Sequence, residues 1–163
     1  MPTRFEFAIN TFGACACAKA DKKKVNVEWV QADAQQLPFA DDSFNVVSIA
    51  FGIRNVENVE LAIQECHRVL KEGGRLVVLE FFPIPNPVWR FLFRLYFLRV
   101  LPVIAAVVRA GRTGAYTYLP ESVDAFYTAS AFAKLLTSNG LQLLSDTALT
   151  GGVSRLFVAV KKS

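Results

Sequence analysis

Hydrophobic and polar residues along this chain follow patterns that predict strands alternating with helices. Residues 4–10 and 25–31 alternate between apolar and polar side chains, as strands with one buried face do. Val46 to Phe51 and Leu76 to Phe81 are short apolar runs, typical of parallel strands buried on both faces. Apolar residues of Asn55 to Lys71 recur at helical spacing. The alternation predicts an α/β fold with a mainly parallel sheet.

The connections between these segments carry their own signals. Residues 13–24 are rich in Ala and Lys and predict a helix, and Asp33 to Ser43 is a polar loop that holds Pro38. Gly73-Gly74 follows the helix predicted from Asn55, and we expect it to supply the left-handed backbone that ends that helix.

The end of the chain predicts a hairpin. Leu141 to Ser145 and Arg155 to Val160 have the pattern of strands, and the short glycine-containing connection 149–152 lies before the second of them. A short connection of this kind favours antiparallel pairing.

Residues 88–110 form an unusually apolar stretch. Four arginines interrupt it and Pro102 lies within it, which excludes a helix that spans a membrane. We expect two amphipathic helices hinged near Pro102. They form either a cap packed on the core or a lid over an apolar substrate or a bilayer surface, and both roles are compatible.

Composition narrows the class of protein. The 163 residues suit one domain, and the net charge of +4 is too scattered to indicate nucleic-acid binding. Three cysteines and a single histidine, His67, favour neither a disulfide framework nor a metal site. No signal peptide is recognisable at the start, so we expect a reduced, cytoplasmic protein, peripheral to the membrane if residues 88–110 meet a bilayer.

Four segments together carry a family resemblance: Asp33-Ala34-Gln35-Gln36-Leu37-Pro38-Phe39, Ala50-Phe51-Gly52-Ile53-Arg54-Asn55-Val56, Arg68 to Leu76 running on to Glu80-Phe81, and Tyr118-Leu119-Pro120-Glu121-Ser122. They resemble the ubiquinone/menaquinone biosynthesis C-methyltransferase family, whose cofactor is S-adenosyl-L-methionine. The resemblance implies a Rossmann-like class I methyltransferase sheet in a single partial domain, residues 1–163, with residues 84–115 as an apolar helical cap.

The resemblance also implies residues for the cofactor. Asp33 would accept a hydrogen bond from the adenine amino group, and the backbone N–H of Ala34 would meet a ring nitrogen. Ala50 would leave room for the cofactor at a strand end, and Asn10 would stand near the ribose hydroxyls. A solvated turn at Asp33 and core packing at Ala50 are the structural alternatives.

On the substrate side the resemblance implies Arg54, Asn55, Tyr118 and Glu121. Asn55 is equally suited to cap the following helix, and Tyr118 and Glu121 have structural alternatives. Thr117 stands where many relatives carry Arg, which weakens this part of the resemblance. The catalytic base stays unassigned, and His67, expected on a helix surface, is not favoured for that role.

One expected feature is missing from the sequence. Class I methyltransferases carry a glycine-rich loop after the first strand, and no two glycines here have G-x-G spacing. The resemblance then implies an incomplete sheet without its first strand, in which Val46 to Phe51 lies at an exposed edge. The predicted function is C-methylation of a prenylated quinol, impaired in this chain. The alternative is a non-catalytic remnant or accessory membrane-associated protein. Homo-oligomerisation or a missing N-terminal half remains open.

Overall fold

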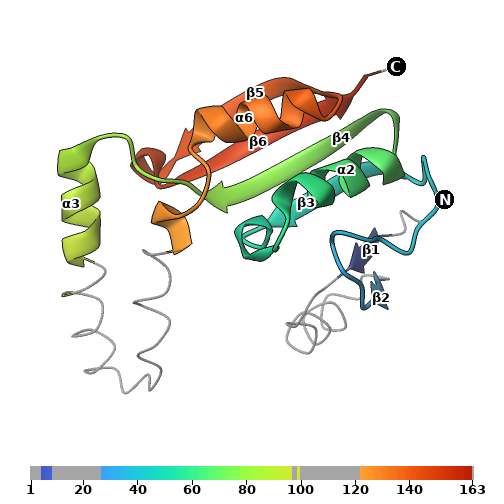
Figure 1. The fold of residues 1–163 in the computed structure, drawn as a ribbon, viewed down its shortest axis with the longest axis horizontal. Helices are drawn as coiled ribbons and strands as arrows, with labels where there is room; N and C mark the ends of the chain where they lie inside the picture. Colours follow the sequence, from blue (N-terminus) through green and yellow to red (C-terminus); the bar gives the residue numbers. More distant parts are fainter. Residues whose placement is uncertain (1–4, 9–26, 97–98, 100–121, 163) are drawn as a thin grey trace.

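The computed structural model describes residues 5–8, 27–96, 99 and 122–162 (Figure 1). Its elements in chain order are β1 (Phe5–Ala8), β2 (Val27–Val30), β3 (Phe44–Ala50), the short 3-10 helix η1 (Ile53–Asn55), α2 (Val59–Val69), β4 (Leu70–Phe81), α3 (Pro87–Leu95), α6 (Ala129–Ser138), β5 (Leu141–Leu149), η3 (Thr150–Gly152) and β6 (Ser154–Lys161). The helix predicted at 13–24 and Pro102 lie outside the described residues.

The described strands form two sheets. β1 and β2 pair in parallel, and the larger sheet has the order β3-β4-β6-β5. β3 and β4 are parallel, whereas β6 is antiparallel to both of its neighbours. The predicted C-terminal hairpin is confirmed. The larger sheet is mixed, however, and not mainly parallel, because the hairpin inserts β6 beside β4. β3 lies at its edge, as expected.

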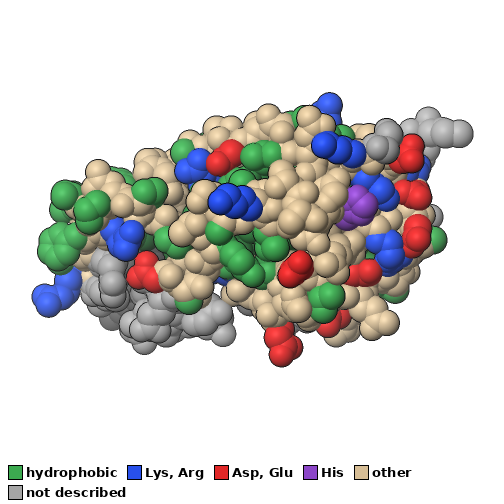
Figure 2. Space-filling model, turned by 45° about the horizontal axis from the view of Figure 1, so that its top comes forward, with side chains coloured by type: hydrophobic (Ala, Val, Ile, Leu, Met, Phe, Trp, Pro, Cys, Tyr) green, Lys and Arg blue, Asp and Glu red, His purple; other side chains and the backbone are tan. Residues whose placement is uncertain are grey.

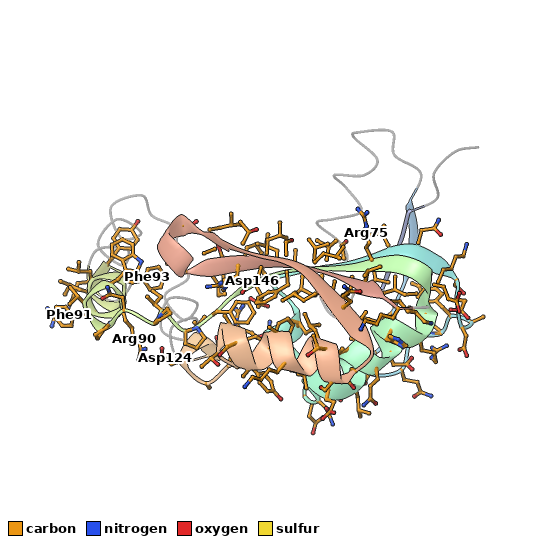
Figure 3. The ribbon with its side chains drawn as sticks, turned by 90° about the horizontal axis from the view of Figure 1, so that it is seen from above. Arg75, Arg90, Phe91, Phe93, Asp124 and Asp146 are labelled. Carbon is orange, nitrogen blue, oxygen red and sulfur yellow. The ribbon has the colours of Figure 1, made fainter. Side chains whose placement is uncertain are left out.

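The core lies on one face of the larger sheet, which α2 and α6 both cover (Figure 3). Ile63 and Cys66 of α2 and Phe132 of α6 are fully or almost fully buried there. The rings of Phe82, Phe132 and Phe157 pack with centroids 5.1–5.4 Å apart, a spacing at which aromatic pairs stabilise a core. Val46 of β3 belongs to the opposite face and is exposed.

α2 begins and ends at different residues from those predicted. Asn58, not Asn55, is its N-cap: the Asn58 Oδ1 accepts a hydrogen bond from Leu61 N at 3.1 Å. Asn55 instead ends η1, so its predicted capping role is wrong. The helix ends at Val69, and the backbone is already extended at Leu70.

The two glycines predicted to end the helix lie inside β4. Gly73 does have a left-handed backbone, with φ of 71°, but four residues beyond the last helical residue. A Cβ at Gly74 would come within 2.7 Å of Lys71 O and 3.2 Å of Asn45 O. The pair therefore lets the irregular start of β4 approach β3 closely, where the register shifts after Phe44.

α3 covers the first part of the apolar segment predicted to be helical. Asn86 caps it: its Oδ1 accepts hydrogen bonds from Val88 N at 2.9 Å and Trp89 N at 3.1 Å, and Pro87 occupies the first turn. Among the described residues, no helix is long and apolar enough to cross a bilayer. The predicted second half of the segment, beyond Pro102, lies outside the described residues.

Candidate active site

The carboxyl ends of β3 and β4 hold a group of polar and aromatic side chains. β3 ends at Ala50, which is exposed, and the chain then turns at Phe51. Phe51 has φ of 54°, a left-handed conformation that is unusual for an aromatic residue, and its N–H donates to Leu79 O at 2.8 Å. This turn directs the chain into η1 and brings Arg54 over the end of β4.

Arg54 forms a buried ion pair with Glu80. The Glu80 side chain is 0% exposed and that of Arg54 only 7%. Arg54 Nη1 donates to Glu80 Oε1, and the backbone N–H groups of Arg54 and Phe81 donate to the same carboxylate at 3.4 Å and 2.8 Å. Three donors thus compensate a carboxylate that has lost its contact with water.

The Arg54 guanidinium is held on its other sides as well. Arg54 Nε donates to Ser122 Oγ at 3.2 Å, and Arg54 Cζ lies 5.6 Å from the centroid of the Phe81 ring. The Phe81 ring packs against Phe51 at 4.7 Å. A cation over an aromatic face in a desolvated place is stabilised by the ring quadrupole. We call these five residues, Phe51, Arg54, Glu80, Phe81 and Ser122, the Arg54 cluster.

Glu80 had no predicted role. A glutamate that ends the apolar run from Leu76 is the signal that could have found it, because a lone carboxylate among buried strand residues needs a partner.

A second polar region is the Asp33 loop, residues 31–43. Asp33 is exposed, and its Oδ1 accepts a hydrogen bond from Gln35 N at 2.9 Å, the geometry of an Asx turn. The Gln35 side chain contacts both carboxylate oxygens at 3.3 Å and accepts a bond from Asn58 N at 3.1 Å. Because Asn58 opens α2, this bond places Asp33 near the segment that leaves β3.

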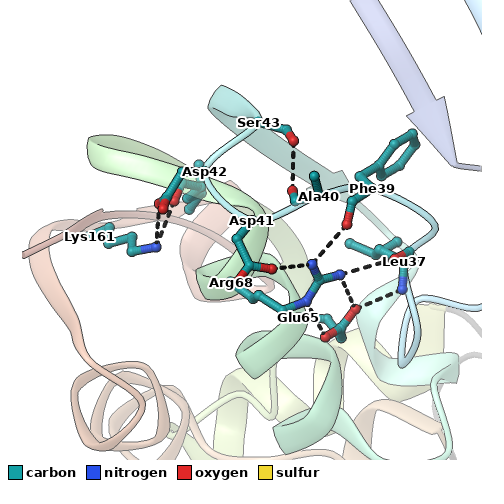
Figure 4. Close-up of polar contacts among 10 residues, drawn as sticks. Leu37, Phe39, Ala40, Asp41, Asp42, Ser43, Glu65, Arg68 and Lys161 are labelled. Atoms are coloured by element: carbon teal, nitrogen blue, oxygen red, sulfur yellow. Dashed lines mark hydrogen bonds and ion pairs between the residues drawn. The ribbon is translucent and has the colours of Figure 1, made fainter.

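The far end of the Asp33 loop is bound by Arg68 of α2 (Figure 4). Arg68 donates to Phe39 O at 2.8 Å and Leu37 O at 3.0 Å, and pairs with Asp41 at 2.7 Å. It also makes two bonds of 2.8 Å to Glu65, one from Nε and one from Nη2. The hydrogen bonds from Arg68 hold the pKa of the Glu65 carboxyl below its usual value.

Several predicted site residues are brought near one edge of the sheet, and others are not described. Asp33 and Ala34 lie in the loop joined to the first turn of α2, Ala50 ends β3, and Arg54 belongs to its cluster. Asn55 is exposed at the end of η1. Asn10, Tyr118 and Glu121 lie outside the described residues. Within the described part of the chain, no group of three His, Cys, Asp or Glu could hold a metal ion.

Comparison with protein-family models matches residues 11–161 to the ubiE/COQ5 methyltransferase family. The chain is 43% identical over 145 residues to the demethylmenaquinone methyltransferase of Thermus thermophilus, covering 89% of this chain and 65% of that one. It is 41% identical over 136 residues to the mitochondrial 2-methoxy-6-polyprenyl-1,4-benzoquinol methylase of Bos taurus, covering 83% of this chain and 41% of that one. The chain thus spans less than two thirds of either relative.

Solved structures agree on the fold. A SAM-dependent methyltransferase from Aquifex aeolicus superposes with a TM-score of 0.63 at 14% identity, over 97% of this chain and 68% of that one. The cyclase SpnF superposes with a TM-score of 0.68 at 15% identity, over 98% of this chain and 65% of that one. These neighbours show a class I methyltransferase fold, and the cyclase among them illustrates that the fold alone does not fix the reaction.

Proposed function

Because this chain belongs to the ubiE/COQ5 methyltransferase family, we propose that it acts in the S-adenosylmethionine-dependent C-methylation of a prenylated quinol that leads to ubiquinone or menaquinone. The observation that carries the proposal is that the connection from β3 to α2 links two polar regions. The Asp33 loop is bonded to Asn58 at the start of α2, and the Arg54 cluster lies only a few residues earlier in the same connection. Open α/β sheets bind ligands at the carboxyl ends of their strands.

The residues of the Asp33 loop and of the end of β3 fit the cofactor. The exposed Asp33 carboxylate can accept further bonds from an exocyclic amine beyond those from Gln35. Ala50 is small and exposed. A Cβ built at Gly52 would lie 3.8 Å from its nearest neighbour atom, Ile49 Cγ2, so the backbone there is not crowded. A ligand could therefore approach this strand end closely.

The chemistry divides between the two regions. The cofactor, when bound, supplies an electrophilic methyl group on a sulfonium. Asp33 and the Ala34 backbone would bind and orient its adenine end. Arg54 and Asn55 would contact the quinol ring, and Glu80 keeps the Arg54 guanidinium in one orientation. Phe51 and Phe81 would exclude water, which favours attack by the ring carbon over side reactions.

Titration calorimetry with S-adenosylmethionine and S-adenosylhomocysteine tests this assignment. Asp33→Ala should weaken binding by roughly 1–3 kcal/mol, the cost of leaving a polar partner unpaired. Asp146→Ala, which removes a carboxylate from the distant β5–β6 hairpin, is the matched control and should leave affinity unchanged. No binding by the folded wild-type chain would contradict the proposed function and favour a non-catalytic accessory role.

For the apolar substrate we propose peripheral contact of α3 with an anionic bilayer. Phe91 is 65% exposed, and Val88, Leu92 and Leu95 of the same helix are also exposed. Figure 2 shows hydrophobic side chains gathered at this end of the molecule, with basic side chains beside them. Arg90 is exposed, and residues 88–110 contain no acidic residue. Apolar burial and attraction to anionic lipid would therefore act together.

Vesicle flotation measures this contact. The chain should float with anionic vesicles at low salt and less at high salt, because salt screens the arginine contribution. Phe91→Ser should reduce flotation, whereas Leu144→Ser, at another exposed apolar side chain on β5, should not. If the chain stays in the unbound fraction when anionic vesicles float at low salt, the membrane contact is contradicted. The cofactor assignment is not affected by that result.

A further inference from the structure

Arg68 directs three of its five guanidinium hydrogen bonds to the Asp33 loop and two to Glu65 of α2. Its Nη1 reaches Phe39 O and Asp41, and its Nη2 reaches Leu37 O (Figure 4). Two of these three acceptors are backbone carbonyls, so their bonds fix the orientation of peptide groups and not only the position of a side chain. Glu65, the fourth acceptor, lies one turn earlier on α2 and orients the guanidinium.

The loop is bonded to α2 along the whole helix. Near its first turn, Gln35 accepts from Asn58 N. Further along, Leu37 N donates to Glu65 Oε2 at 2.8 Å. At the last turn, Asp42 N donates to Arg68 O at 3.1 Å and Ser43 N to Val69 O at 2.9 Å. The loop therefore runs along α2, and Arg68 is the α2 side chain that makes the most bonds to it, to Phe39 O, Asp41 and Leu37 O.

The arrangement needs the planar fork of arginine. Five N–H donors in fixed directions can serve two carbonyls and two carboxylates at once, whereas a lysine ammonium has three donors and no plane. Arg68 is 31% exposed, and half-exposed ion pairs add little to stability. The number and direction of its bonds suit it better to setting a loop conformation than to stabilising the fold.

We propose that Arg68 is a positioning residue for adenine-side binding: through Leu37, Phe39 and Asp41 it sets the loop conformation in which Asp33 faces the ligand. The identity of the ligand rests on the proposed function, but the role of Arg68 in setting the loop conformation does not. Among the residues that the structure describes, Asp33 bonds only locally, to Gln35 and Gln36, so its placement follows from where the rest of the loop is held.

Two measurements on the full chain test the proposal, with Arg68→Lys as the variant. Arg155→Lys is the matched control, because Arg155 also makes a two-pronged pair, with Asp146 at 2.7 Å and 2.8 Å, and is similarly half-exposed. Hydrogen exchange of peptides that cover residues 31–43 comes first. Exchange there should quicken in Arg68→Lys and stay unchanged in Arg155→Lys, while urea unfolding shows both variants folded.

The second measurement is a double-mutant cycle with S-adenosylhomocysteine as the probe. Arg68→Lys should weaken affinity about tenfold, the size of one charged hydrogen bond, but by less than about twofold when Asp33 is already Ala. A purely structural role would weaken binding equally in both backgrounds. Wild-type exchange in Arg68→Lys, or equal losses across the cycle, overturns the proposal. Quickened exchange in a chain that binds no adenosyl ligand leaves the positioning intact and refutes the proposed function instead.

Discussion

Two arginine–glutamate pairs in the described part of the chain have the same chemistry in different surroundings. Arg54 and Glu80 are almost completely buried, and the backbone N–H groups of Arg54, in η1, and of Phe81, at the end of β4, also donate to the Glu80 carboxylate. Arg68 and Glu65 are only partly buried, with side chains 31% and 19% exposed, and share their bonds with a loop. When one partner of a buried pair is removed, the other is left as an uncompensated charge. In an exposed pair, water solvates the charge that remains. The first is therefore coupled to the fold, and the second to the shape of a binding loop.

Loss of Glu80 should have the largest effect of the changes considered. Glu80→Ala leaves the Arg54 guanidinium buried without its carboxylate, and we expect a loss of roughly 3–5 kcal/mol in the free energy of unfolding. Urea unfolding followed by circular dichroism measures it. The double variant Arg54→Met/Glu80→Leu removes both charges and should recover most of the loss, because well-packed apolar residues often replace a buried pair at no cost.

If Glu80→Ala lowered the free energy of unfolding no more than a surface substitution does, the comparison would fail for the buried pair. It would mean that water or other groups reach Arg54 when Glu80 is gone, and that the cluster is not desolvated in solution.

Loss of Arg68 should cost less than loss of Glu80. Arg68→Ala removes several charged hydrogen bonds, but water can reach the groups it leaves behind, so we expect about 1–2 kcal/mol. The same urea titration measures it, with Arg155→Ala as a control expected below about 1 kcal/mol. If Arg68→Ala destabilised the chain as much as Glu80→Ala, exposure would not separate the two pairs.

Loss of the Asn58 cap should have a smaller effect, on the helix that carries the exposed pair. Asn58→Ala removes the bond to Leu61 N and should cost about 1 kcal/mol, whereas Asn58→Asp keeps an acceptor at the helix N-terminus and should be nearly neutral. Thermal unfolding distinguishes them. Asn55→Ala is the matched control, and equal losses at Asn55 and Asn58 would contradict the observed start of α2.

The smallest expected effect is a pH dependence. The Arg68 hydrogen bonds lower the pKa of Glu65 in the folded chain, so folding favours its charged form. That stabilisation is complete above the ordinary glutamate range and is lost as pH falls through the lowered folded pKa. Unfolding measured between neutral and acid pH should show a shallower acid loss in Glu65→Gln than in the wild type. An identical slope would show that Glu65 is not linked to folding.

The sequence predicted those parts of the fold that depend on local pattern. The positions of β3 and β4, the body of α2 and the C-terminal hairpin follow from periodicity and turn residues, and the structure confirms them. Burial on both faces is wrong for β3, because Val46 is exposed on the face opposite the core. The start of α2 was predicted wrongly at Asn55, because the helical pattern does not reveal the turn through η1 that moves the cap to Asn58.

Other features depend on neighbours that are distant in sequence. Gly74 is needed because Asn45 O of β3 lies against it, and no local signal distinguishes that role from a helix end. Glu80 became part of the site only when η1 placed Arg54 beside it, and Arg68 only when the Asp33 loop folded along α2. Periodicity reports which residues face the core, but not which polar side chains meet.

The bonds along α2 also bear on the order in which this part of the molecule assembles. Leu37 and Phe39 contact α2 across only 28 to 31 residues of chain, whereas Lys161 of β6 reaches Asp42 across 119 residues and Leu70 O across 91. Loop closure is less costly in entropy for the shorter spans, and contacts of low sequence separation form faster. The loop, β3 and α2 can thus form a folding nucleus to which the C-terminal hairpin is added, with Lys161 closing a long loop.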